Sequence, residues 1–393
     1  MGKGSPDGAA RLSISGLKKI NIQFVAMVLA LAAIWAVFSL GTGGSFLTAR
    51  NISDLFQQMA ETGVLAVGMT MVIIAGEIDL SVGSLAGLCG GIAAILQVWR
   101  GAGTAAAVGG ALAAGVLLGL WQGWWVARRK VPSFIVTLGG LLVFRGVLLG
   151  ITNGETVAPL HADFVAIGQN YLSPWWGLLL AVLGVAAYAF LQVRDISVRK
   201  SYRLESPSGL LVTARVVVLA VVLGGFTVLL NSYLGVPVPI LIVALLALVF
   251  TFVSLRTRFG RGIFAIGGNR DAARLSGLPI ARYILLVFAL NGLMAALSGV
   301  IMTARVNAAT IDAGTNYELN AIAACVIGGT SLMGGIGSIY SSLIGALIMA
   351  SLDNGMSMMN LQPYWQYVIK GLILILAVWF DVVSKNARAM SRS

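Results

Sequence analysis

The residues best suited to chemistry in this sequence lie in the stretch GEIDLSVGS, residues 76–84, which separates two apolar runs. Glu77 and Asp79 supply carboxylates and Ser81 supplies a hydroxyl. A carboxylate is costly in hydrocarbon, so ionisable residues there usually face a water-filled cavity or a partner. A simpler interpretation is a solvated turn, with Asp79 capping a helix that begins at Ser81. Under the first interpretation Glu77, Asp79 and Ser81 line a polar pathway.

Arg145 is a second candidate because it is roughly central in the apolar stretch 133–151. Its side chain is too deep to reach water comfortably, so it needs a partner or a polar cavity. A structural ion pair and direct contact with a ligand are equally consistent with the sequence. The candidate counter-charges are Glu61, Glu77, Asp79 and Asp353.

Asn291 and Asn354 are polar residues in otherwise apolar predicted helices, in the stretches FALNGLM and ASLDNGM. Their amides can hydrogen-bond across helices or to a ligand hydroxyl. Interhelical bonding is the simpler interpretation for both. We keep both as candidate pathway residues.

The polar loop at residues 256–283 predicts one short helix of about two turns. Asn269 is a good N-cap, Asp271 lies in the first turn where the helix dipole favours acid, and Gly277 before Pro279 is a stop signal. The helix could lie along a membrane surface or dock into a groove of a partner; without further information the first is favoured. Its candidate functional residues are Asn269, Arg270, Asp271, Ala273, Arg274, Leu275 and Gly277.

The elements that must position these residues are membrane-spanning helices. The chain is 58% hydrophobic and 10% charged, and apolar stretches near the 20 residues needed to cross a bilayer recur throughout it. We predict an all-α polytopic bundle of about 10–12 transmembrane helices, with broken or re-entrant segments near 77–84 and 329–338. The candidate spans are 21–41, 58–76, 81–99, 104–126, 133–151, 175–193, 213–231, 236–254, 283–302, 317–333, 337–356 and 364–381.

The distribution of basic residues predicts the orientation of the chain. With the N-terminus inside, 21 of the 26 Lys and Arg residues fall in inside segments, while Arg50, Arg100 and Arg305 fall outside. This asymmetry follows the positive-inside rule and places both termini in the cytoplasm. The net charge of +12 therefore indicates topology and not a nucleic-acid partner.

Enzyme and cofactor motifs are absent from the sequence. There is no HExxH, GxSxG or CxxC pattern, and Cys89 and Cys325 both lie in apolar segments. These features predict neither an enzyme nor a metal or cofactor site. No GxxxxGK[ST] loop occurs, so any ATP that drives this protein must bind to another chain.

Four stretches resemble the permease subunits of bacterial ATP-binding-cassette importers for monosaccharides, in the ribose and xylose branch. They cover both halves of the chain in the family's order. The matching stretches are GVLAVGMTMVIIAGEIDLSVGS (63–84), VPSFIVTLGGLLVFRG (131–146), RFGRGIFAIGGNRDAARLSG (258–277) and ELNAIAACVIGGTSLMGGIGS (318–338). The xylose type is the more similar, through WQGWWVARRKVPSFIVTLGG and an added pair of spans between about 175 and 231.

The resemblance implies a multi-pass protein of the bacterial inner membrane that forms a path for a monosaccharide, D-xylose by the closer similarity. It implies a second copy of the chain, surrounding lipid, two cytoplasmic ATPase subunits and an extracytoplasmic sugar-binding protein as partners. The loop 256–283 matches the coupling loop that contacts the ATPase. The implied organisation is a cytoplasmic segment 1–20, one transmembrane domain 21–382 and a cytoplasmic tail 383–393.

An ion-coupled secondary sugar transporter is the alternative. Its motivation is the buried charge of Glu61, Glu77, Asp79 and Arg145, one of which would handle a proton or a sodium ion.

Overall fold

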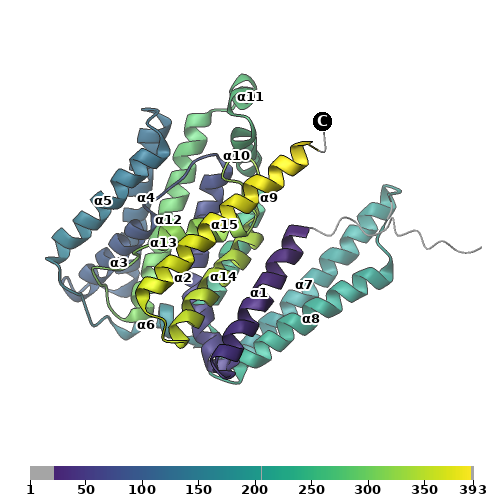
Figure 1. Cartoon of the computed structure of the whole chain (residues 1–393), viewed down its shortest axis with the longest axis horizontal. Coiled ribbons are helices and arrows are strands. Elements are labelled where there is room, and N and C mark those ends of the chain that lie inside the picture. The colour runs from purple at the N-terminus through teal and green to yellow at the C-terminus, as the bar shows by residue number, and fades with distance from the viewer. Residues whose placement is uncertain (1–21, 205, 391–393) are drawn as a thin grey trace, which may run out of the picture.

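The computed structural model describes residues 22–204 and 206–390 and is almost entirely helical (Figure 1). The predicted cytoplasmic segment 1–20 and the last three residues of the predicted tail lie outside the described residues. The all-α prediction is confirmed. The one sheet in the described part is a ribbon of two short antiparallel strands, β1 and β2.

The first half of the chain comprises α1 (Ile22–Gly41), the 3-10 helix η2 (Ser45–Leu47), α2 (Ala49–Ile74), α3 (Val82–Val98), α4 (Thr104–Ala127), α5 (Ser133–Thr152), α6 (Ala162–Gln169), β1 (Tyr171–Leu172) and α7 (Pro174–Ser201). The second half comprises α8 (Gly209–Asn231), β2 (Val236–Pro237), α9 (Val238–Arg256), α10 (Arg258–Gly268), α11 (Arg270–Leu275), α12 (Ile280–Val306), α13 (Tyr317–Ile327), α14 (Ile339–Met358) and α15 (Pro363–Met390).

Eight helices in the described part are long and apolar enough to cross a membrane, and α3, α13 and the first part of α15 are shorter apolar helices. The predicted broken segments are present. A non-helical stretch, 75–81, separates α2 from α3. The predicted span 317–333 is wrong in its extent, because α13 has only 11 residues and a non-helical stretch, 328–338, follows it.

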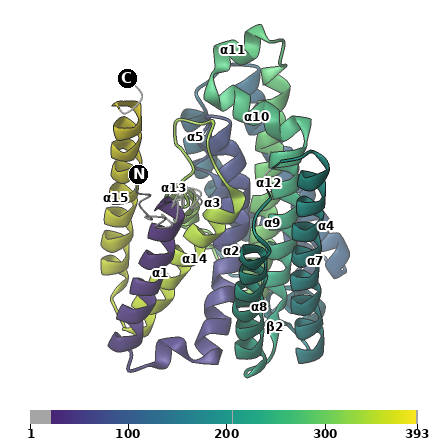
Figure 2. The ribbon, with the colours of Figure 1, turned by 90° about the vertical axis from the view of Figure 1, so that its right-hand side faces the viewer.

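The core of the bundle is built on α2 and α12. Both are largely buried, whereas α7 and α8, which have few buried residues, form a hairpin at the right-hand edge of the molecule in Figure 1 and on its near side in Figure 2. The interior also holds polar residues of α2, among them Ser53, Gln57 and Glu61, whereas the exposed apolar residues of α7 and α8 suit contact with lipid. The first broken segment lies largely among packed helices, where irregular backbone is tolerated, whereas the second is partly exposed, with Met333 at 82% and Ile336 at 59%.

The predicted inside segments share one end of the molecule. The start of α1, the end of α15, the α7–α8 connection and the α10–α11 pair all lie at the upper end in Figure 1, and α6 lies at the lower end. This arrangement agrees with the alternation of spans predicted from charge. That the upper end is the cytoplasmic one stays a prediction from the positive-inside rule.

Candidate functional site

The break between α2 and α3 holds a buried carboxylate in a polar network. Asp79 is 1% exposed, and its Oδ1 accepts hydrogen bonds from the backbone N–H of Ser81 at 2.8 Å and from the Ser81 hydroxyl at 2.6 Å. Its Oδ2 accepts a bond from Asn291 Nδ2 of α12 at 2.8 Å. Gln122 of α4 donates to the Ser81 hydroxyl at 2.7 Å. The structure therefore brings Asp79, Ser81 and Asn291 together. The predicted cap is wrong in its detail, because α3 begins after Ser81 without a side-chain cap and Asp79 binds the N–H of Ser81, which precedes the helix.

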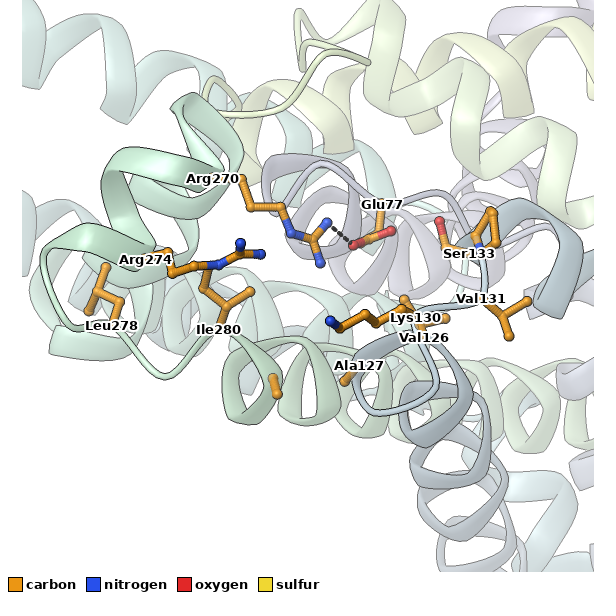
Figure 3. A pocket seen from close by; sticks show the side chains of 12 residues that line it. Glu77, Val126, Ala127, Lys130, Val131, Ser133, Arg270, Arg274, Leu278 and Ile280 are labelled. Atoms are coloured by element: carbon orange, nitrogen blue, oxygen red, sulfur yellow. Dashed lines mark hydrogen bonds and ion pairs between the residues drawn. The ribbon is translucent and has the colours of Figure 1, made fainter.

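Glu77 faces a different part of the molecule. Its carboxylate forms an ion pair with Arg270 Nη1 at 2.8 Å, and its side chain is almost fully buried while that of Arg270 is 45% exposed. The pair lies in a cleft of about 640 Å³. Figure 3 shows the side chains of Lys130 and Arg274 directed into the same cleft. Glu77 therefore connects the α2–α3 break to the first residue of α11.

The predicted helix in the loop 256–283 is α11, and its capping is as predicted. Asn269 Oδ1 accepts a hydrogen bond from the backbone N–H of Ala272 at 2.9 Å. Gly277 has a φ of +82°, the left-handed conformation that ends many helices. Ala273 is buried, whereas Leu275 is 89% exposed. An apolar side chain thus projects from the end of the molecule, as α11 does in Figures 1 and 2.

The sequence analysis missed α10, the 11-residue helix that precedes α11. Its last turn lies directly against the end of α2: a Cβ added to Gly267 would stand 1.8 Å from the carbonyl oxygen of Ile74. The backbone N–H of Gly335, in the second broken segment, donates to the same oxygen at 2.9 Å. The α10–α11 pair and both broken segments consequently meet at one point.

Arg145 contacts the chain between α12 and α13. Its guanidinium donates to the carbonyl oxygen of Ile311 at 2.6 Å and to the hydroxyl of Thr315. None of the four candidate counter-charges is its partner. Glu61 pairs with Arg305, Glu77 with Arg270 and Asp353 with Lys370, while Asp79 is bound by Ser81 and Asn291. Arg145 is only half-buried, and neutral oxygens can satisfy such a guanidinium, which composition alone does not reveal.

We expect Arg145→Leu to lower the stability of the membrane domain and its transport rate. The substitution removes two hydrogen bonds from a charged donor, worth on the order of 3 kcal/mol together, and leaves the Ile311 carbonyl without its partner. The check is thermal unfolding in detergent together with transport in proteoliposomes. Arg145→Lys keeps the charge but not the planar guanidinium that donates both hydrogen bonds. Its loss of stability and of transport rate should therefore be intermediate. Wild-type behaviour of the leucine variant would remove Arg145 from the candidate site.

Asn354 lies apart from the other predicted residues. Its Oδ1 accepts a hydrogen bond from Asn51 Nδ2 at 3.0 Å, which joins α14 to α2.

Sequence reasoning also missed a network in which Glu61 pairs with Arg305 and accepts a bond from the hydroxyl of Tyr317 at 2.7 Å. A carboxylate in a predicted span signals a need for a partner, but the sequence does not indicate which one.

These features define a class: a multi-pass helical membrane protein with interrupted helices around a polar interior. Residues 51–378 match the family described as the permease component of the branched-chain amino acid transport system, and the chain belongs to this family. The expectation of a membrane permease and not an enzyme is confirmed.

Sugar permeases are among the most similar relatives. The chain is 53% identical over 372 residues to the xylose transport system permease protein of Escherichia coli (strain K12), covering 95% of each chain. It is 50% identical to the protein of that name from Haemophilus influenzae, covering 94% of this chain and 99% of the relative. The ribose import permease protein of Escherichia coli (strain K12) is 36% identical, covering 86% and 87%. No solved structure matches the chain.

Proposed function

We propose that this chain is the inner-membrane permease subunit of an ATP-driven importer for D-xylose. Two copies form the path, ATPase subunits bind at the end that carries α11, and a sugar-binding protein delivers the sugar at the opposite end. Residues 21–382 form the single transmembrane domain, 256–283 the coupling loop, and 1–20 and 383–393 cytoplasmic segments. The observation that carries the proposal is the 53% identity over 95% of both chains to a xylose permease.

The geometry at the α11 end supports a coupling role. Leu275 is exposed at the end of the molecule, where it can enter a groove of a partner, and the exposed Arg274 beside it lines the cleft. Arg270 lies beside them and is paired with Glu77. Displacement of α11 would therefore act directly on the α2–α3 break and on the nearby network of Asp79, Ser81 and Asn291. We assign Glu77 to coupling, and Asp79, Ser81, Asn291, Arg145 and Asn354 to the walls of the path.

The test is transport and ATP hydrolysis in proteoliposomes that contain this chain with its ATPase and binding protein. Xylose should stimulate ATP hydrolysis and accumulate inside, and ribose and galactose should do so less. Liposomes with this chain alone should accumulate no sugar. An assembled complex that responds to none of the three sugars would overturn the proposed substrate.

The Glu77–Arg270 pair predicts a rescue experiment. Glu77→Arg and Arg270→Glu each place like charges together and should each lower ATP-driven transport about tenfold, because a misplaced charge at this depth costs more than 1.4 kcal/mol. The double variant restores the attraction and should recover most of the rate. If the two single variants and the double variant are all equally impaired, the ion pair itself is not what transport requires.

The alternative, an ion-coupled secondary transporter, makes a distinct prediction. Collapse of the proton and sodium gradients at constant ATP would then abolish uptake, whereas the ATP-driven importer would continue to work. The pairing of Glu61 and Glu77 with arginines disfavours the alternative, because a carboxylate that carries a proton or a sodium ion must be free to exchange it.

A further inference from the structure

A small polar chamber lies between α2, α12, α13 and α14. Its volume is about 150 Å³, enough for several water molecules or a small polar solute. Arg305 is one residue from the end of α12 and Asp353 is five residues from the end of α14. The chamber therefore lies in the half of the membrane domain away from α11. Its polar lining consists of Gln58, Thr62, Arg305, Tyr317, Asn320 and Asp353.

The charges around the chamber compensate one another. Glu61 pairs with Arg305, and Asp353 Oδ1 lies 2.6 Å from Lys370 Nζ. Asn320 Nδ2 also donates to Asp353, at 3.3 Å. Two negative and two positive groups thus leave no uncompensated charge to hold an ion. A neutral ligand suits such a site better than a charged one.

Two lining side chains remain available for a ligand. Gln58 and Thr62 make no side-chain hydrogen bond to any residue that the structure describes, and their spacing of four puts them on one face of α2. An amide and a hydroxyl each donate and accept, as sugar hydroxyls do. The Tyr317 ring adds a flat apolar surface beside them. Together they provide the mixture of groups that a polyhydroxylated ring requires.

A second cavity, of about 240 Å³, lies beside the chamber, and Asn320 lines both. Its other polar lining residues are Asn316, Tyr367 and Lys370, and the remainder of its lining is apolar. The polar groups are therefore concentrated in the chamber, which is where a hydrophilic solute would find hydrogen-bond partners.

We propose that this chamber is a site on the translocation path where side chains contact the monosaccharide. Gln58, Thr62 and Asn320 influence which sugar passes. The inference rests on the proposed function and adds to it the contact residues. Two observations support it: the charges around the chamber compensate one another, and the Gln58 amide and the Thr62 hydroxyl are free to bind a ligand.

The test uses the complete complex in proteoliposomes. Thr62→Val combined with Gln58→Leu removes the two free polar groups with little change in volume, and xylose transport should fall at least about tenfold. Thr227→Val is the matched control. Thr227 is equally buried at 5% exposure, but its hydroxyl bonds to the Leu223 carbonyl of its own helix at 2.8 Å. The control should leave transport unchanged.

A second measurement does not depend on transport. Thr62→Cys introduces a thiol into a chain whose two native cysteines are fully buried, so a small polar thiol reagent should label position 62. Saturating xylose should slow that labelling several-fold. Wild-type transport by the double variant, together with labelling that xylose does not slow, would overturn the chamber and leave the importer proposal standing. If the wild-type complex does not transport xylose, the labelling of Thr62→Cys is measured with ribose and galactose. Slower labelling with either sugar would support the chamber as a site of sugar contact, and unchanged labelling with both would overturn it.

Discussion

Leu275→Asp should abolish most ATP-driven transport while the protein stays folded in the membrane. Leu275 is 89% exposed at the end of α11, so the substitution should change the stability of the isolated chain by no more than about 0.5 kcal/mol. In the complex, the same side chain would fill an apolar pocket of the ATPase. Anchors of this kind contribute about 2 kcal/mol or more, or at least about thirtyfold in affinity. Arg274→Asp should act in the same direction.

The measurement compares co-purification of the ATPase with transport in proteoliposomes. Leu210→Asp is the matched control, because Leu210 is 82% exposed in the first turn of α8 and precedes the predicted span 213–231. An acidic residue there suits the helix dipole. The control should retain both the ATPase and transport. If Leu275→Asp and Leu210→Asp behave alike, α11 is not the docking helix.

Features of the fold that depend on local chemistry could be predicted from the sequence. The apolar runs gave most helices within a few residues, and Asn269 and Gly277 mark the ends of α11 because capping involves only neighbouring residues. The helix α10 was missed. Its glycines at 260, 262, 267 and 268 resemble a loop, yet close packing on α2 overrides their low helix propensity.

The site was predictable only in its residue types. Asp79, Ser81 and Asn291 were named as polar residues in apolar surroundings, and the structure brings them together. Their contact joins positions 212 residues apart, and no pattern in a single sequence encodes such a distance. For the same reason Arg305, assigned to an outside segment, was not recognised as the partner of Glu61, 244 residues away. Burial identifies a group that needs a partner, and only the packing of the helices identifies the partner.

The Glu61–Arg305 pair should be the costliest ion pair to break. The Glu61 side chain is 1% exposed and that of Arg305 is 26% exposed, so Arg305→Gln would leave a buried carboxylate with only the Tyr317 hydroxyl as a partner. Removing one member of a buried pair costs about 3–5 kcal/mol. We therefore expect a large fall in the thermal midpoint in detergent and little assembled complex. Glu61→Gln combined with Arg305→Gln removes both charges and should recover much of the loss.

The same substitution at an exposed pair provides the control. Arg199 and Asp195 are 2.7 Å apart with side chains 35% and 51% exposed, and such surface pairs contribute about 0–1 kcal/mol. Arg199→Gln should therefore leave the thermal midpoint almost unchanged, although it removes the same charge as Arg305→Gln. Equal thermal midpoints for the two variants would contradict the claim that the buried Glu61–Arg305 pair is costly to break. So would a double variant whose midpoint is no higher than that of Arg305→Gln alone. The contrast isolates burial as the cause, because the residue change is identical and only the surroundings of the charge differ.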